Sequence, residues 1–164
     1  MNQHVVRNII KEFTYGIRTA ETFVDGTHKP EYKFQGWKNE FCDNIFKSFF
    51  IKNTSYPVGR VIEHSFCPVW PRQTAMCFDV YVSDSNPQYV TAPGCYKLAT
   101  ITLEMPIPES MEKASEDELI ARSVIASFKF NHDMLVVKAV CNTTKKEVQA
   151  TLNYFEERAC ANSG

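Results

Sequence analysis

The feature that most constrains the fold of this chain is the recurrence of apolar residues at every second position. Residues 147–154 alternate strictly between polar and apolar side chains, and apolar residues also recur with a period of two in 76–82, 99–105 and 124–130. This is the period of a β-strand with one buried face. The pattern therefore predicts several strands that each turn one face toward a shared core.

Turn signals separate these runs and indicate how the strands connect. Residues 131–133 and 142–145 are short polar bridges of the kind that closes hairpins. Less regular alternation predicts further strands at 13–19, 46–52 and 61–66. Several short strands in one chain favour an antiparallel arrangement over a parallel sheet. We therefore expect a mainly β fold, an antiparallel β-sandwich of about eight strands.

Two segments depart from this pattern. Residues 21–44 contain two glycines, a proline, Trp37 and many charged residues, which predicts one long inserted loop between two strands. Residues 106–122 are rich in Glu and Lys, and Ser115 and Glu118 have the spacing of a capping box. We expect a short surface helix at 116–121.

Length and charge limit the class of function. With 164 residues the chain suits one domain, and a formal net charge of -1 offers no basic excess for phosphate backbones. No nucleic-acid binding is therefore expected. No apolar run approaches the length of a membrane span, and the N-terminus lacks the residue order of a signal peptide. We expect no membrane association and a cytoplasmic location.

Motifs for cofactors and metals are missing from the sequence. The six cysteines are spread singly with no CxxC pair, and the four histidines are isolated, so neither a metal site nor a cofactor is expected. Reduced cysteines that behave as small hydrophobes are the favoured interpretation, and three disulfides are the alternative for a secreted protein. There is also no phosphate loop and no nucleophile elbow.

The stretch 13–19, Phe-Thr-Tyr-Gly-Ile-Arg-Thr, resembles the first strand after the interdomain linker of the 70-kDa heat-shock chaperones. The resemblance continues in order through 49–57, 75–83, 127–140 and 148–154. Further short motifs are similar to the divergent 12A/12B branch of that family, namely 14–16, 28–31, 42–46, 65–68, 71–73 and 93–97. The resemblance covers the chain from about residue 5 to residue 155, and the order of the motifs carries it.

The resemblance implies a domain organisation and a function. Residues 1–12 are similar to a linker and the end of an ATPase domain, 13–155 to the substrate-binding β-sandwich domain, and 156–164 would form a C-terminal tail. The expected partners are unfolded or extended client polypeptides, together with the ATPase domain of a parent chain. The fragment itself is expected to hydrolyse no ATP and to be no enzyme.

In that family an extended client peptide lies in an apolar cleft between two strands and two loops, beneath an arch. Carried over by position, the resemblance implies these peptide-binding residues: Ile17, Arg18, Thr19, Ala20, Ile45, His64, Ser65, Phe66, Cys67, Met76, Phe78 and Val124. The main chain of Arg18, Thr19 and Ser65 would pair with the peptide, and the apolar side chains would accept its centre. Apolar residues at alternating positions also fit an ordinary sandwich core, so this alternative stays open.

Two other functions remain open at this point. In the first, the inserted loop fills the cleft, with Trp37 as the cover-loop anchor, and the domain is a scaffold for a specific folded partner. In the second, Cys67 and His64 form a thiolate–imidazole pair of a cysteine-dependent enzyme, although a buried thiol beside a polar edge residue explains the same spacing.

Overall fold

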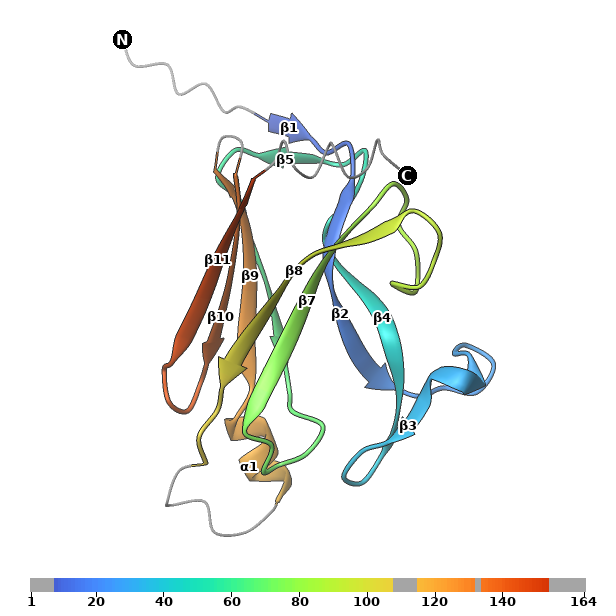
Figure 1. The fold of residues 1–164 in the computed structure, drawn as a ribbon, viewed down its shortest axis with the longest axis vertical. Helices are drawn as coiled ribbons and strands as arrows, with labels where there is room; N and C mark the ends of the chain where they lie inside the picture. The colour runs from blue at the N-terminus through green and yellow to red at the C-terminus, as the bar shows by residue number, and fades with distance from the viewer. Residues whose placement is uncertain (1–7, 108–114, 132–133, 154–164) are drawn as a thin grey trace.

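Two antiparallel sheets face each other and enclose the core (Figure 1). A computed structural model describes residues 8–107, 115–131 and 134–153. The first sheet has the order β3 (Lys33–Gln35), β4 (Glu40–Phe50), β2 (Thr14–Thr22), β7 (Ala75–Ser83) and β8 (Cys95–Glu104). The second has the order β11 (Glu147–Asn153), β10 (Met134–Cys141), β9 (Val124–Asn131) and β6 (Val61–Phe66). The expected mainly β, antiparallel fold is confirmed.

Four short elements complete the described residues. β1 (Asn8–Ile10) pairs with β5 (Ser55–Pro57) as a two-stranded ribbon at one end of the sandwich (Figure 1). The 3-10 helix η1 (Pro30–Tyr32) precedes β3, and α1 (Glu116–Ala121) precedes β9. The side chain of Ser115 accepts a hydrogen bond from the main-chain N–H of Glu118 at 3.1 Å. The predicted surface helix is thus confirmed, and it begins at the predicted cap.

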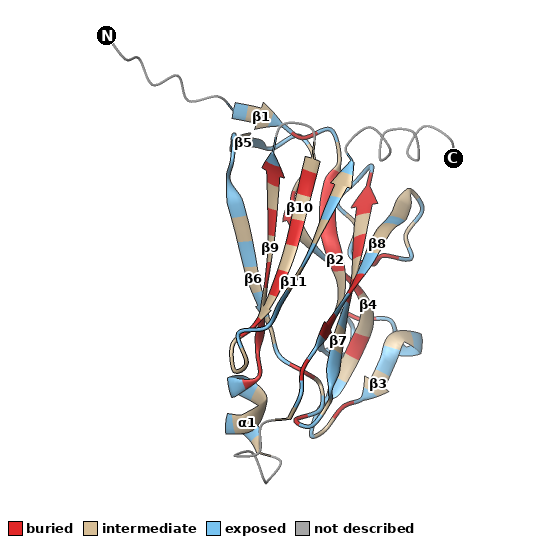
Figure 2. Cartoon of the chain, turned by 60° about the vertical axis from the view of Figure 1, so that its left-hand side comes forward, coloured by how far each residue is buried: buried red, intermediate tan, exposed pale blue. Residues whose placement is uncertain are grey.

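Alternate residues of facing strands build one continuous core (Figure 2). The apolar stripe predicted at 124–130 is the buried face of β9. Across the two sheets, the ring of Phe49 in β4 stacks on Phe128 with centroids 4.2 Å apart, and Tyr15 in β2 meets Phe130 edge-on at 4.9 Å. Because each aromatic side chain removes a large apolar area from water, these pairs hold the sheets together.

The segment 21–44 is more ordered than an open loop. β2 continues to Thr22, and β3 forms a hairpin with the start of β4. A second small cluster lies beside this hairpin, where Cys42, Ile45 and Tyr89 are buried and Phe23 and Tyr32 pack on them. The segment around η1 therefore packs on a small apolar cluster that is separate from the sandwich core.

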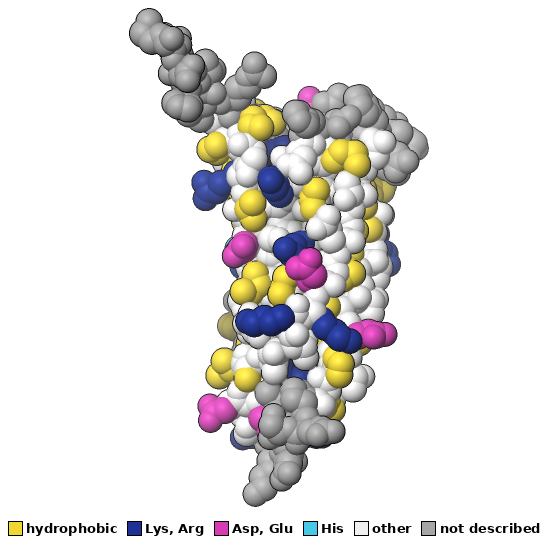
Figure 3. Space-filling model, turned by 90° about the vertical axis from the view of Figure 1, so that its left-hand side faces the viewer, with side chains coloured by type: hydrophobic (Ala, Val, Ile, Leu, Met, Phe, Trp, Pro, Cys, Tyr) yellow, Lys and Arg dark blue, Asp and Glu magenta, His cyan; other side chains and the backbone are white. Residues whose placement is uncertain are grey.

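The outer face of the four-stranded sheet carries charges of both signs. Figure 3 shows Lys, Arg, Asp and Glu side chains interleaved with apolar ones on the side of the molecule where this sheet lies. Lys138 of β10 and Glu147 of β11 form an ion pair there at 3.2 Å. This face therefore presents no single-sign field for a polyanionic ligand.

Some sequence-based expectations fall outside the described residues. These are His132 and Asp133 of one predicted turn, residues 1–7 of the expected linker, Tyr154 at the end of the last predicted strand, and the expected tail at 156–164. The antiparallel pairing of Asn131 with Met134 nevertheless shows that β9 and β10 form the predicted hairpin.

Gly16 lies at a close approach of β2 to β4. A Cβ atom at this position would collide with the carbonyl group of Lys47 and would lie 2.7 Å from the ring of Phe46. The β2–β4 register also shifts between Tyr15 and Gly16. A residue without a side chain is therefore required here for steric reasons.

We expect Gly16→Ala to lower the free energy of unfolding by at least about 2 kcal/mol, because it overpacks the β2–β4 contact. Gly59→Ala is the control, since a Cβ there meets no atom within 4 Å and only its φ of +83° opposes the substitution. Urea unfolding of both variants measures the difference. A loss for Gly16→Ala no greater than that for Gly59→Ala would contradict the packing argument.

Candidate functional site

A cleft opens in the five-stranded sheet where β2 and β7 separate. Their pairing runs from Thr14 with Ser83 to Ile17 with Val80. Beyond this point the two strands diverge (Figure 1). Arg18, Thr19 and Ala20 of β2 line one wall of the cleft, and 76–79 of β7 line the opposite wall. These are the residues that would have paired next if the antiparallel register had continued.

A β-bulge accompanies the separation. Thr19 pairs with Ile45 and Glu21 with Cys42, so Asp43 and Asn44 of β4 together oppose the single residue Ala20. Asn44 has a φ of 62°, and its main-chain N–H donates to Asp43 Oδ1 at 2.6 Å. A bulge bends its strand and increases the local twist. The β2–β4 pair is thus turned away from β7 as it leaves the core.

Two connecting segments form the remaining walls. The hairpin arm (residues 33–42) contributes Phe34, and the β6–β7 arm (residues 67–74) contributes Cys67, Pro68, Val69 and Gln73. The main-chain N–H of Trp37 donates to the carbonyl of Val69 at 3.2 Å, so the two arms are joined to each other. The space between these walls is open to solvent and has a volume of about 240 Å³.

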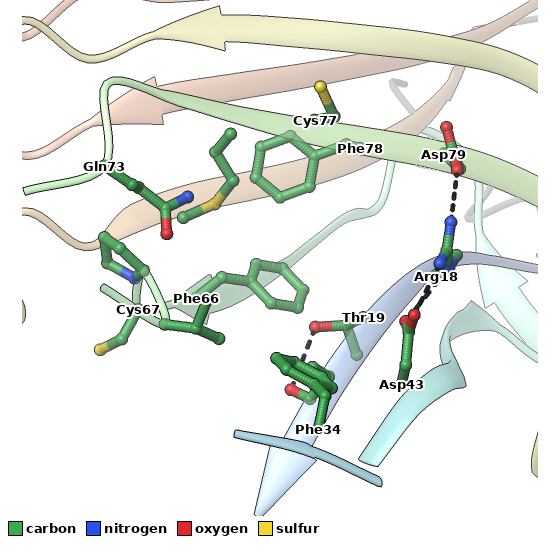
Figure 4. A pocket seen from close by; sticks show the side chains of 14 residues that line it. Arg18, Thr19, Phe34, Asp43, Phe66, Cys67, Gln73, Cys77, Phe78 and Asp79 are labelled. Atoms are coloured by element: carbon green, nitrogen blue, oxygen red, sulfur yellow. Dashed lines mark hydrogen bonds and ion pairs between the residues drawn. The ribbon is translucent and has the colours of Figure 1, made fainter. Parts of the chain in front are cut away.

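The interior of the cleft is largely apolar and aromatic (Figure 4). Phe66 and Phe78 meet edge-on with ring centroids 5.7 Å apart, and Phe66 stacks at 6.5 Å on Phe49 of the sandwich core. Met76 is half-buried beside them. Because Phe66 and Phe78 rest on the core, the cleft has a fixed floor into which an apolar side chain can pack.

A charged network closes the end of the cleft at the point where the strands separate. Arg18 donates to both carboxylate oxygens of Asp43, at 3.2 Å and 2.7 Å, and to Asp79 at 3.4 Å (Figure 4). Thr100 and Lys97 hold Asp79 from its other side, at 2.6 Å and 3.9 Å. Hydrogen bonding to Asp43 is the main cause that raises the pKa of Arg18 above its ordinary value.

The structure brings together seven of the residues expected from the sequence. Those that line the cleft are Arg18, Thr19, Ala20, Phe66, Cys67, Met76 and Phe78. Five others lie elsewhere: Ile17 and Val124 are fully buried in the core, Ile45 belongs to the second small cluster, His64 packs edge-on against Phe49, and Ser65 is exposed on β6. Trp37 is half-exposed at the tip of the hairpin arm, with Lys38 Nζ 4.4 Å from the centre of its ring.

Several residues that line the cleft were not among the site residues expected from the sequence. These are Phe34, Asp43, Pro68, Val69, Gln73, Cys77 and Asp79. One signal was present for Asp43, since buried Cys42 and Ile45 stand three positions apart and so break the two-residue period of a regular strand. The residues of the β6–β7 arm follow no period, and only the fold brings them to the cleft.

His64 and Cys67, the two residues of the cysteine-enzyme hypothesis, lie in surroundings that differ from each other. The His64 ring faces inward against Phe49, whereas Cys67 is exposed at the start of the β6–β7 arm. The five cysteines that the structure describes are all free thiols.

Over the described ranges, no group of three His, Cys, Asp or Glu side chains is placed to hold a metal ion. None of the helices described there is long and apolar enough to cross a membrane.

Sequence comparisons relate the chain to one group of proteins. It matches no protein-family model. It is 25% identical over 152 residues to heat shock 70 kDa protein 12B of Homo sapiens, which covers 92% of this chain and 22% of that protein. It is 24% identical over 143 residues to heat shock 70 kDa protein 12A of Mus musculus, which covers 87% of this chain and 20% of that protein. The chain thus shows weak homology to members of the 70-kDa heat-shock family over most of its own length, and it spans about a fifth of these relatives.

We expect His64 to make the stability of the domain depend on pH. Burial, helped by the nearby Lys47, lowers the pKa of its imidazole, although a hydrogen bond with the main chain of Ser48 opposes this. The folded state therefore favours the neutral ring, while the unfolded chain takes up a proton near pH 6.5. The stability that His64 contributes is present above about pH 6.5 and is lost as pH falls through the folded pKa.

We therefore expect the wild-type protein to lose stability between pH 7.5 and pH 5.5, and His64→Phe to lose less over the same interval. The phenyl ring keeps the packing against Phe49 and cannot titrate. Chemical unfolding at a series of pH values gives both curves. Parallel curves for the two proteins would show that His64 has no part in the pH dependence.

Proposed function

We propose that the chain is a client-binding β-sandwich domain of a chaperone related to the 70-kDa heat-shock family, and that it holds an extended apolar polypeptide in the cleft between β2 and β7. The observation that carries this proposal is the separation of two neighbouring strands over an aromatic floor. The homology to heat shock 70 kDa proteins 12A and 12B supports the chaperone-related assignment.

The main chain supplies the affinity in this proposal. β2 pairs with β4 on one side and β7 pairs with β8 on the other, so the edges that 18–20 and 76–79 turn toward the cleft have no strand partner among the described residues. A polypeptide in extended conformation can hydrogen-bond to such an edge, as an added strand does. Successive client side chains would then alternate between the floor of the cleft and its mouth.

The side chains supply the selectivity. A client residue directed inward meets Phe66, Met76 and Phe78, so an apolar residue gains by leaving water, whereas a charged one loses its hydration. The carboxylates of Asp43 and Asp79 are already bound to Arg18. The apolar part of a client would therefore not extend past this charged end of the cleft.

The alternative, a scaffold whose cleft is filled by its own loop, has less support. Phe34 is the aromatic residue of the hairpin arm that reaches the cleft, and it forms part of the wall. A volume of about 240 Å³ remains beside it, enough for apolar side chains of a client. Regulation by an ATPase domain in a parent chain belongs to the proposal as well, because the chain spans about a fifth of its relatives.

The first test is a substitution in the cleft. We expect the wild-type domain to bind fluorescent, extended, leucine-rich peptides, and Met76→Asp to bind them at least about ten-fold more weakly, because a carboxylate replaces an apolar contact worth more than 1.4 kcal/mol. Val136→Asp is the control, since Val136 is half-buried on the outer face of β10. Fluorescence anisotropy measures both. Equal affinities for the two variants, at matched stability, would remove the cleft as the binding site.

The second test asks whether the two arms cover the cleft. Trp37 is half-buried where the hairpin arm meets the β6–β7 arm. Losing the contacts of an indole at this junction should shift the balance between open and closed arms, so Trp37→Ala should change peptide affinity by several-fold. A gain means that the arms compete with the client, and a loss means that they clamp it. An unchanged affinity, with the unfolding free energy also unchanged, would show that Trp37 has no role in covering the cleft.

A further inference from the structure

Arg122 is the largest of the fully buried side chains and lies directly after α1, with 1% of its surface exposed. Arginine is rarely buried to this extent, because its guanidinium stays charged at all ordinary pH values. Desolvation lowers the pKa of Arg122 below its ordinary value, which reflects the cost of holding this charge away from water. A cation kept in such a place needs compensating contacts.

The contacts of Arg122 are with the main chain of two other segments. Nη1 donates to the carbonyl of Pro71 at 2.6 Å, and Nη2 donates to the carbonyl of Met105. Pro71 is in the β6–β7 arm, and Met105 follows the last residue of β8. One planar guanidinium thus ties together three parts of the chain that are far apart in sequence, and its fork of donors fixes both the distance and the direction between them.

These contacts reach the cleft through the β6–β7 arm. Met105 N also donates to the carbonyl of Thr74 at 2.7 Å, which holds the end of the arm to the same segment. Within the arm, Gln73 Nε2 donates to the carbonyl of Ala75 at 2.8 Å, and Gln73 N donates to the carbonyl of Trp70 at 3.2 Å. These bonds join Trp70, Gln73 and the start of β7, with Pro71 between them, so we expect a displacement of Pro71 to shift its neighbours Val69 and Gln73 at the cleft.

We propose that Arg122 is a positioning residue of the client cleft. It sets the distance between the β6–β7 arm and the floor formed by Phe66 and Phe78. This inference rests on the proposed function, because the arm is a wall of the proposed binding site. Arg122 touches no client itself. It acts through the carbonyl of Pro71, and it is distinct from the Trp37–Val69 hydrogen bond that holds the other side of the arm.

The same geometry makes lysine a poorer fit than arginine at position 122. A lysine ammonium is a single point charge on a flexible stem, whereas the guanidinium addresses two carbonyl groups at once through two nitrogens. A lysine would therefore satisfy one acceptor and leave the other buried without a donor. Methionine would keep the apolar stem and remove both hydrogen bonds.

The test compares Arg122→Met and Arg122→Lys with a control that loses stability elsewhere. Val137→Ala serves as this control, because Val137 is 1% exposed in β10 of the four-stranded sheet. Two properties are measured under conditions of equal stability. The first is the dissociation rate of a fluorescent leucine-rich peptide. The second is the rate at which a maleimide labels Cys67, relative to Cys77, with the labelled residues resolved by mass spectrometry. Both thiols are exposed and line the cleft, but only Cys67 is in the arm.

We expect Arg122→Met to speed peptide dissociation by roughly ten-fold and to change the Cys67-to-Cys77 labelling ratio several-fold, while Val137→Ala changes neither. For both properties, Arg122→Lys should give values between those of the wild type and Arg122→Met. It serves as the main variant if Arg122→Met fails to fold. An unchanged labelling ratio in both arginine variants overturns the proposal. If no peptide binds to the wild type, the proposed function fails, but the labelling ratio still decides whether Arg122 positions the arm.

Discussion

The shape of the cleft depends on a local irregularity of the sheet, the bulge that places Asp43 and Asn44 of β4 opposite Ala20 of β2. The first half of β2 is held between β4 and β7, and its second half follows β4 alone. Since the bulge bends β4, it carries the end of β2 away from β7 and leaves two strand edges facing each other. Asp43 of this bulge also binds Arg18, so a residue of the bulge supplies charge at the inner end of the opening.

Opening a sheet removes cross-strand hydrogen bonds, and other contacts must hold the diverging strands. Arg18 links β2 to β4 and to β7 through Asp43 and Asp79, although these side chains are partly exposed, so that each ion pair contributes less than about 1 kcal/mol. The aromatic floor contributes more, because Phe78 is 3% exposed and packs with Phe66 against the core. The floor thus stabilises the separated strands and also provides the proposed binding surface.

The sequence predicted the sandwich well because alternation is a local property of each strand. The stripe at 124–130, the helix at 116–121 and its Ser115 cap all follow from neighbouring residues, and the structure has them where they were expected. The cleft was predictable only in part. The resemblance grouped Ile17 and Val124 with Met76 and Phe78 as cleft residues, although Ile17 and Val124 are fully buried. Alternation could not separate them, because core and cleft positions share the same period. The burial of Arg122 could not be read from the sequence, because the carbonyl groups that bind its guanidinium belong to distant segments.

The two arms of the cleft are fixed in different ways, and this difference limits how a client could be admitted. The hairpin arm is part of the sheet through β3 and β4, and the second small cluster around Tyr89 supports its base. The β6–β7 arm has no strand of its own and is held by individual hydrogen bonds, from Arg122 to Pro71 on one side and from Trp37 to Val69 on the other. A few hydrogen bonds open at a lower free-energy cost than a packed hairpin. Under the proposed function, the movement that admits or releases a client would therefore be that of the β6–β7 arm, with the β2–β4 side of the cleft as the fixed wall.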